Sequence, residues 1–346
     1  MVFEAADGSP NWRQSSTMAR RAFVRVLLRG AARRARAEVD WIASRRKAAD
    51  VGVFHEFHQP PYGGGNQFLL ALVGDLRRRG LAVEIDRISG RTPVCLYNSF
   101  NFDFGRLRRF ARADVRMVHR VDGPVGVYRG FDDGTDRRIA EINALADATI
   151  LQSRYSLEKH RELGLELRNP VVIPNAVDPA IFHPPSQREP LAARRLRVIA
   201  TSWSANPRKG ADVLAWLDEQ LDHQKYEVTF AGNTEQALRH IRVVAPVPSE
   251  QLADLLRAHD VFLAPSQDDP CSNALLEALA CGLPAAFRRS GGHPELVGDA
   301  GIGFDDAEEV PEALARLALE LEERRAAIRI ASLREVADRY VELLEL

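Results

Sequence analysis

The sequence has few cysteines, and none of them has the spacing of a metal site. Its 346 residues include only Cys95, Cys271 and Cys281. Such a sparse, odd-numbered set favours a reducing compartment and no structural disulfide. No run of 18 apolar residues occurs either, so the sequence predicts no transmembrane helix. These absences lead us to expect a cytoplasmic protein.

Neither sign of charge is in excess. The 47 lysines and arginines nearly balance the 48 aspartates and glutamates, which leaves no overall attraction to an anionic polymer. Residues 13–36 are the local exception, with eight arginines and no acidic residue. Apolar residues at helical spacing there predict a helix over 19–46. Because aromatic residues do not alternate with the arginines, we expect no nucleic-acid partner.

Two interpretations of this basic helix stay open. It can lie as a peripheral amphipathic helix over residues 13–46 on the anionic inner face of a membrane. Alternatively, it packs on the first domain with its arginines in water.

Length and pattern indicate two domains. Chains of 346 residues usually exceed one domain, and 45% hydrophobic with 27% charged residues is typical of globular proteins. In both halves, short apolar strands alternate with helical patterns, which predicts parallel sheets with helices on both faces. The predicted parts are an extension (1–50), a first α/β domain (51–178), a proline-rich linker (179–194), a second α/β domain (195–332) and a final helix (333–346).

The most informative stretch is residues 269–284. A short apolar run before it suits a buried strand. Ser272 can then cap a helix, because its hydroxyl can accept a hydrogen bond from a backbone amide of the first turn. Gly282 is placed to end that helix in a left-handed conformation. The carboxylates of Asp269 and Glu277 therefore flank a helix N-terminus, where backbone amides can receive phosphate or sugar oxygens.

This stretch resembles the donor-binding signature of the family 4 retaining glycosyltransferases. In that family two acids separated by seven residues precede a Cys-Gly-x-Pro stop; here the first acid is Asp269 rather than the usual Glu. The resemblance implies the GT-B fold: two Rossmann-like domains with parallel sheets facing across a cleft, and a C-terminal helix crossing back to the first domain. It implies that Glu277 holds the ribose hydroxyls of a nucleotide sugar and that Asp269 faces the transferred sugar. Cys271, Ser272 and Asn273 then belong to the donor site.

A glycine-rich loop lies in the first half, at residues 55–68, after a predicted strand and before a helix predicted from Phe68. A run of glycines alone is weak evidence for a phosphate-binding loop, and this run lacks the spacing of a dinucleotide site. It resembles the Gly-Gly loop of the family, which lies against the donor diphosphate and the acceptor. The resemblance implies a donor role for Gly64 and Gly65 and an acceptor-side role for Asn66.

His119 follows a strand predicted at Val115–Val118, which places it at the carboxyl edge of the sheet, where ligands of such folds bind. Family 4 enzymes carry a histidine after this strand, close to the transferred sugar. We therefore expect His119 to be catalytic, with Arg120 and Asp122 on the acceptor side.

The second domain opens with a strand and the loop 202–210. Most family 4 enzymes have an arginine several residues before the Lys-Gly pair; here Trp203 and Ser204 fill that part of the loop. Lys209 is present, with Arg208 beside it. Positive charge on a leaving diphosphate stabilises the transition state of transfer. We expect Lys209 to be catalytic and both residues to bind the donor.

An acidic turn at residues 132–136 invites a metal interpretation, because hard cations prefer clustered carboxylates. The simpler interpretation is a polar turn that caps the next helix. The resembled family binds its donor without a metal, so we expect no metal and no cofactor.

The sequence thus predicts a retaining, metal-independent glycosyltransferase. It would move a hexose from a nucleotide-diphosphate sugar to a hydroxyl of a glycan, a lipid-linked glycan or a small molecule. The alternatives are an epimerase or phosphorylase of the same fold, or a non-catalytic protein that binds a nucleotide sugar. The sugar, the base and the acceptor are not readable from the sequence.

Overall fold

The computed structural model describes residues 49–59, 63–191 and 194–346. The predicted basic helix at 19–46, and with it the membrane interpretation, lies outside these residues. Within the described ranges, every helix is too short or too polar to cross a membrane.

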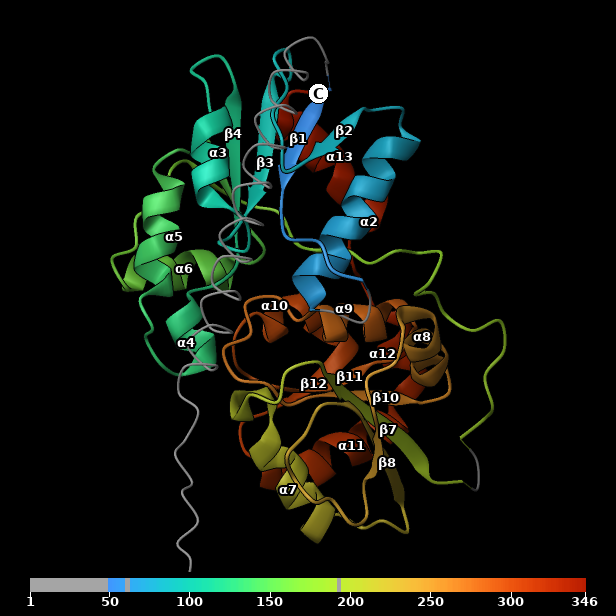
Figure 1. Ribbon diagram of the computed structural model, residues 1–346. Helices are drawn as coiled ribbons and strands as arrows, with labels where there is room; N and C mark the ends of the chain where they lie inside the picture. The colour runs from blue at the N-terminus through green and yellow to red at the C-terminus, as the bar shows by residue number, and fades with distance from the viewer. Residues whose placement is uncertain (1–48, 60–62, 192–193) are drawn as a thin grey trace, which may run out of the picture. The chain divides into compact units, whose positions relative to one another are not determined.

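The first lobe is built on a six-stranded parallel sheet in the order β2-β1-β3-β4-β5-β6 (Figure 1). Its strands are β1 (Val51–Phe54), β2 (Val83–Ile85), β3 (Val94–Asn98), β4 (Arg116–Val121), β5 (Ala148–Leu151) and β6 (Pro170–Val172). Its helices are α2 (Gly64–Arg78), α3 (Phe104–Phe110), α4 (Val125–Arg129), α5 (Thr135–Asn143) and α6 (Arg154–Glu162). Strands β1, β3 and β5 are buried along their whole length, because helices cover the sheet on both faces.

The second lobe repeats this architecture with a six-stranded parallel sheet in the order β12-β11-β10-β7-β8-β9. Its strands are β7 (Leu196–Ser202), β8 (Tyr226–Gly232), β9 (Arg242–Val244), β10 (Val261–Ala264), β11 (Ala285–Arg288) and β12 (Gly301–Phe304). Its helices are α7 (Ala211–Gln220), α8 (Ser249–Arg257), α9 (Asn273–Ala280), α10 (His293–Val297), α11 (Val310–Leu319) and α12 (Leu321–Ala326), with single 3-10 turns η1 (Pro207–Lys209), η2 (Gly298–Ala300) and η3 (Ala307–Glu309). The two parallel sheets confirm the predicted α/β architecture.

The last helix, α13 (Leu333–Leu344), belongs to the first lobe although it follows the second in sequence. A capping box between Ser332 and Glu335 starts it. Its apolar face enters the core of the first lobe, where Tyr340 packs against Phe68 of α2 with ring centroids 5.7 Å apart. In Figure 1, α13 (red) lies among the blue elements of the first lobe. The predicted return of the C-terminal helix is confirmed.

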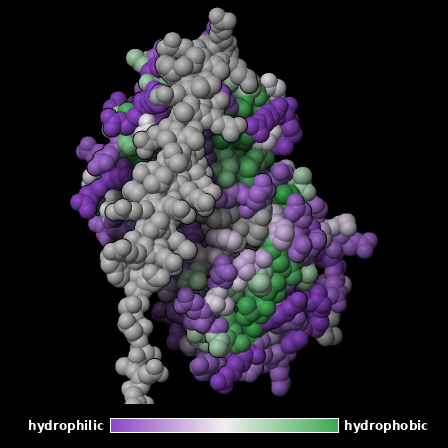
Figure 2. All heavy atoms as spheres, viewed as in Figure 1, coloured by the Kyte–Doolittle hydropathy of each residue, from purple (hydrophilic) through white to green (hydrophobic). Residues whose placement is uncertain are grey.

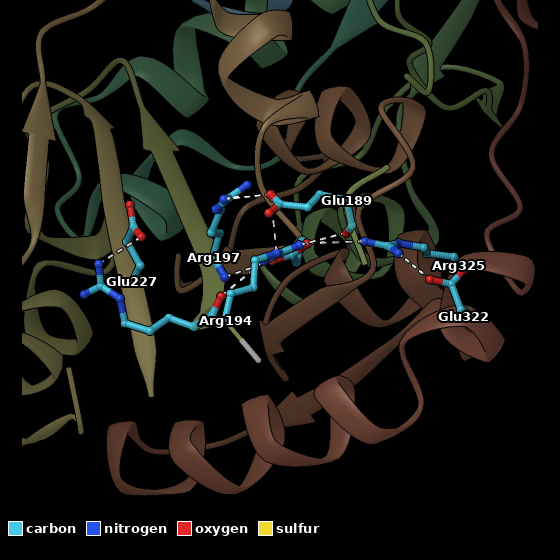
Figure 3. A network of polar contacts seen from close by, with 8 residues as sticks. Glu189, Arg194, Arg197, Glu227, Glu322 and Arg325 are labelled. Atoms are coloured by element: carbon cyan, nitrogen blue, oxygen red, sulfur yellow. Dashed lines mark hydrogen bonds and ion pairs between the residues drawn. The ribbon is translucent and has the colours of Figure 1, made fainter. Parts of the chain in front are cut away.

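A network of ion pairs attaches the end of the connecting segment to the second lobe (Figure 3). Arg194 donates two hydrogen bonds to Asp260, of 2.6 and 2.9 Å. Burial alone would raise the pKa of Asp260, but Arg194 and the amide of Arg197 hold it below its ordinary value. Glu189 accepts from Arg197 at 2.9 Å. The chain therefore enters β7 from a fixed position.

Exposed hydrophobic side chains are few among the described residues. On the face shown in Figure 2, outer helices and loops are mostly hydrophilic, and hydrophobic residues gather in a strip on the second lobe. Phe131 and Trp203 are among the exposed large hydrophobic side chains, with exposed fractions of 58% and 43%. Both line the cavity described next.

Candidate active site

A cavity of about 640 Å³ is lined by residues from both lobes. This volume suits a drug-sized or nucleotide-sized ligand. The cavity is bordered by residues that follow the carboxyl ends of parallel strands, which is where α/β folds bind ligands. Nine of the residues predicted for the site line it: Gly64, Gly65, Asp122, Lys209, Asp269, Cys271, Ser272, Asn273 and Glu277. His119, Arg120, Asn66 and Arg208 do not.

Helix α9 begins at the cavity, as the sequence predicts. The hydroxyl of Ser272 accepts a hydrogen bond from the amide of Leu275 at 3.3 Å, which confirms the N-cap. Gly282 follows the helix with φ of +78°, a left-handed conformation that glycine adopts without strain. Ser272, Asn273 and Ala274 at the start of α9 line the cavity, and a helix N-terminus favours negative charge there.

Asp269 and Lys209 form an ion pair at the cavity. The Nζ atom of Lys209 lies 2.6 Å from Oδ2 of Asp269, and the amide of Cys271 donates to the other carboxylate oxygen at 3.2 Å. Burial alone would raise the pKa of Asp269, but Lys209 and these hydrogen bonds hold it below its ordinary value. Asp269 is therefore ionised at neutral pH and oriented from two sides.

Glu277 lies about one turn into α9 and lines the same cavity. Its exposed fraction is 8%, and its carboxyl group makes no hydrogen bond or ion pair with any described residue. Burial raises its pKa to about 8. A buried carboxyl without a partner is costly unless a ligand supplies donors. Its position beside the helix N-terminus makes it the natural acceptor for a ligand with paired hydroxyl groups.

Two glycines support the loop that carries Asp269. Gly291 has φ of +65°, and a Cβ atom there would lie 2.3 Å from the carbonyl oxygen of Asp269. The amide of Gly292 donates to the same carbonyl at 2.9 Å. His293, fully buried beside them, lies 3.1 Å from the hydroxyl of Ser266. The Gly-Gly-His sequence therefore lets two loops of the second lobe approach closely.

The glycine-rich segment differs from its prediction in one respect. Gly64, Gly65 and Asn66 form the first turn of α2 rather than a loop before a helix that starts at Phe68. A Cβ atom on Gly64 would lie only 2.3 Å from Nδ2 of Asn273. Glycine is therefore required where α2 meets the start of α9. Asn66 is buried and bonds the backbone of His58 in both directions at 3.0 Å, so it fixes the loop instead of facing the cavity.

His119 is not at the end of its strand. The sequence predicts that the strand stops at Val118, but β4 continues to Val121, which places His119 within the sheet. It is fully buried, its ring stacks on Tyr97 with centroids 4.4 Å apart, and its Nε2 lies 2.8 Å from the carbonyl oxygen of Ser99. Burial lowers its pKa to about 3. The expected placement of His119 at the carboxyl edge is therefore wrong.

Arg120 points away from His119, since neighbouring residues of a strand face opposite sides. It is also fully buried and does not line the cavity, so its expected acceptor-side role cannot be a direct contact from this position. Its Nη1 atom lies 2.6 Å from Oδ1 of Asn98 and 3.1 Å from Oδ1 of Asp122. Asp122, which follows the end of β4, is the member of this segment that lines the cavity.

Arg208 lies beside the site but is engaged elsewhere. Its guanidinium is ion-paired with Asp268, which also accepts a hydrogen bond from the hydroxyl of Tyr155 in the first lobe at 2.8 Å. The carboxylate of Glu295 in turn accepts hydrogen bonds from the amides of Arg154 and Tyr155, both at 3.1 Å. These contacts join the N-terminus of α6 to the second lobe.

The acidic turn at 132–136 stabilises local structure. Asp136 accepts hydrogen bonds from the amides of Val125 and Gly126 at 2.6 and 2.9 Å, so it caps the preceding helix α4. The expectation that the turn caps the next helix is wrong, because α5 begins after Gly134 without a side-chain cap. Asp133 is ion-paired with Arg129. Across the described ranges, no three His, Cys, Asp or Glu side chains come together in a way that could hold a metal ion.

Several residues at the cavity were not predicted from the sequence. Tyr128 and Phe131 of the first lobe line it opposite the second-lobe residue Trp203. The side chain of Asn206 donates to the carbonyl oxygen of Arg129 at 3.3 Å, which brings the loops that carry these aromatic residues together. An exposed aromatic residue in a loop after a strand is the only local signal that could have indicated them.

Comparison with known proteins agrees with this geometry. Residues 195–321 match the family model described as Glycosyl transferases group 1. A D-inositol 3-phosphate glycosyltransferase of Corynebacterium aurimucosum is 26% identical over 225 residues, which cover 55% of this chain and 53% of that protein. The match to the group 1 glycosyltransferases thus lies within the second lobe. The chain spans about half the length of the curated relatives that it matches.

Other relatives and solved structures extend the comparison. One subunit of the phosphatidylinositol N-acetylglucosaminyltransferase from Arabidopsis thaliana is 29% identical, over 47% of this chain and 37% of that protein. A sucrose-phosphate synthase from Thermosynechococcus elongatus superposes with a TM-score of 0.67 at 16% identity, covering 87% of this chain and 98% of that one. Anabaena HepE in complex with UDP and glucose gives 0.63 at 15% identity, covering 86% and 99%. These superpositions show the GT-B fold.

Proposed function

We propose that this chain transfers a hexose from a nucleotide-diphosphate sugar to a hydroxyl group of an acceptor, with retention of the anomeric configuration. The observation that carries the proposal is the cavity in which Lys209, Asp269 and Glu277 meet beside the N-terminus of α9. Its volume and its mixture of apolar walls and a few polar groups suit a nucleotide sugar. Relatives that are named for glycosyl transfer, and a neighbour solved with UDP and glucose, support the same substrate class.

The donor would be held at three points. Glu277 would accept hydrogen bonds from the two ribose hydroxyls, which supply donors that its buried carboxyl group does not find among the described residues and so favour its ionised form. The first amides of α9, after Ser272, would meet the diphosphate, since a helix N-terminus favours anions. Lys209 would then exchange part of its contact with Asp269 for the phosphate oxygens.

The transfer step needs stabilised charge on the leaving group more than it needs a nucleophile. As the bond between the anomeric carbon and the phosphate oxygen breaks, negative charge grows on that oxygen beside Lys209. Asp269 is held by Lys209 and by the amide of Cys271, which disfavours its attack on the sugar. We infer that the acceptor hydroxyl attacks from the face that the diphosphate leaves, and that its proton passes to the departing phosphate oxygen. Positive side chains would serve as the counter-charge, without a metal.

The direct test of this function has two parts. A panel of sugar nucleotides is screened for protection against thermal unfolding, because a ligand that binds only the folded state raises its stability. The protecting donor is then incubated with simple glycosides as acceptors, and proton NMR determines the anomeric configuration of the product. Transfer with inverted configuration would overturn retention, and hydrolysis or epimerisation alone would overturn transfer.

A further inference from the structure

Arg120 is the largest fully buried side chain of the described residues. Its guanidinium lies over the ring of Phe68 at 5.2 Å and donates hydrogen bonds in two directions. Through Nη1 it reaches Asn98 and Asp122, and through Nη2 it donates to Oδ1 of Asn175 at 2.8 Å. It therefore contacts three segments of the first lobe that lie far apart in the sequence.

Stability alone is a poor reason for this arrangement. A buried cation loses its hydration, and well-packed hydrophobic replacements of buried charged groups are often neutral or stabilising. The only carboxylate that pairs with Arg120 among the described residues is Asp122, whose side chain is 32% exposed and lines the cavity. The ion pair thus connects the buried core to a residue of the site.

The hydrogen bond from Nη2 of Arg120 leads, through Asn175, to the second lobe. Because a guanidinium has only donors, the Asn175 amide must turn its oxygen toward Arg120, and its nitrogen is then free to donate. Nδ2 of Asn175 donates to Oδ1 of Asn273 at 3.2 Å. Asn273, the first residue of α9, is thereby fixed with its own nitrogen against Gly64.

We propose that Arg120 is a positioning residue for the transfer reaction, acting through Asn175. One buried guanidinium orients Asp122 of the first lobe and, by fixing the Asn175 amide, Asn273 of the second lobe. Both targets line the cavity. The two walls of the site are thus set relative to each other by a side chain that touches no substrate. The catalytic part of this inference rests on the proposed function.

The decisive variant is N175D. The carboxylate of an aspartate at position 175 still accepts the hydrogen bond from Arg120. Its charge is opposite to that of the guanidinium, so we expect the fold to be retained. The carboxylate has no donor for Oδ1 of Asn273, so the hydrogen bond that holds the Asn273 amide in its present orientation is lost. We expect an unchanged melting temperature and a fall in kcat of about 10-fold to 100-fold, the scale of a small misplacement of reacting groups. A folded N175D enzyme with wild-type kcat would overturn the proposal.

Two further variants separate positioning from packing. N98D makes the same charge change beside Arg120 without touching Asn273, so its kcat should fall far less than that of N175D. R120M keeps the length of the side chain and removes its donors. The losses of kcat in R120M and N175D should not multiply in the double variant, because both variants break the same connection from Arg120 through Asn175 to Asn273. Fully multiplicative losses would contradict the connection.

Crystallography provides a test of this proposal that does not depend on activity. In a crystal structure of N175D, the side chain of Asn273 should leave its position beside Gly64, whereas in N98D it should stay. An unmoved Asn273 in N175D would overturn the proposal whether or not a donor is known. A wild-type protein that transfers nothing would instead contradict the proposed function, and the crystallographic result would stand by itself.

Discussion

Lys209 and Asp269 lie 2.6 Å apart at the cavity, on two loops of the second lobe that follow neighbouring strands. The lysine keeps the acid ionised, and the acid holds the lysine in place before a donor arrives. A preorganised cation needs little reorganisation when charge develops on the leaving phosphate. The ion pair should therefore matter more for transfer than for folding.

Removal of the Lys209 side chain separates its contribution to transfer from its contribution to folding stability. K209A should lower kcat by about 100-fold to 1,000-fold, the usual cost of losing one group that stabilises developing charge. It also leaves Asp269 buried without its cation, so some stability is lost at neutral pH. Steady-state transfer kinetics and thermal unfolding measure the two effects.

The double variant K209A/D269N and the surface variant K225A are the controls. The double variant should recover the melting temperature but not kcat, because the uncompensated carboxylate is gone. Lys225 forms an exposed ion pair with Asp222, so K225A should change neither quantity. Normal turnover in K209A with a collapsed melting temperature would show that Lys209 is purely structural.

Glu277 should make the unliganded protein less stable as the pH rises. Its pKa is raised from 4.5 to about 8, so between these values the folded state holds a proton that the unfolded state has lost. The free energy of unfolding therefore falls as the pH rises through this window. Urea unfolding of the wild type and of E277Q across pH 5–9 measures this contribution as a difference. If the difference between the two proteins is independent of pH, Glu277 does not have a raised pKa.

Gly64 should not tolerate a side chain. A Cβ atom would lie 2.5 Å from Cβ of Asn273, a contact that only movement of α2 or α9 can relieve. G64A should therefore abolish thermal protection by the donor.

Gly74 lies on the same helix and provides the control. Its Cβ atom would meet only the end of Arg78 at 3.5 Å. G74A should retain protection and stabilise the protein by up to about 1 kcal/mol, the difference in helix propensity between glycine and alanine. Equal protection of G64A and G74A would contradict the close approach of the two helices.

The hydrogen bonds between the N-terminus of α6 and Glu295 of the second lobe should stabilise the folded protein. Glu295 accepts from the first two amides of α6, where negative charge also interacts favourably with the helix dipole. E295A should lower the free energy of unfolding by about 0.3–1 kcal/mol, the scale of an exposed negative charge at a helix N-terminus. Glu158, exposed on the same helix, is the control, and E158A should be neutral. Equal effects of the two variants on urea unfolding would show that the Glu295 contact is not formed in solution.

The second-lobe part of the site could be predicted because its signals are local. Ser272 as a cap, Gly282 as a stop and the spacing of Asp269 and Glu277 all lie within one strand–loop–helix unit. The parallel sheets followed from the alternation of strands and helices, and the GT-B arrangement followed from the resemblance to family 4. The roles assigned to these residues remain predictions.

Of the first-lobe residues, Gly64, Gly65 and Asp122 line the cavity as expected, but the placements of His119 and Arg120 were missed for two physical reasons. Whether His119 faces a cavity depends on where β4 ends, and a difference of three residues moved it into the sheet. Arg120 is buried because Asn98, Asp122 and Asn175 converge on it from separate segments, which no local pattern reveals. The aromatic residues Phe131 and Trp203 were equally hidden, since only the tertiary contact of their loops places them at one cavity.

The measurement that bears most directly on the donor site is calorimetric titration of nucleoside diphosphates, UDP first, into the wild type and E277A. Exposed Glu312 on α11 provides the matched control, E312A. We predict binding to the wild type and to E312A, and no detectable heat with E277A, because the ribose hydroxyls lose their carboxylate acceptor. Equal affinity of E277A and the wild type would contradict the assignment of this cavity to a nucleotide sugar.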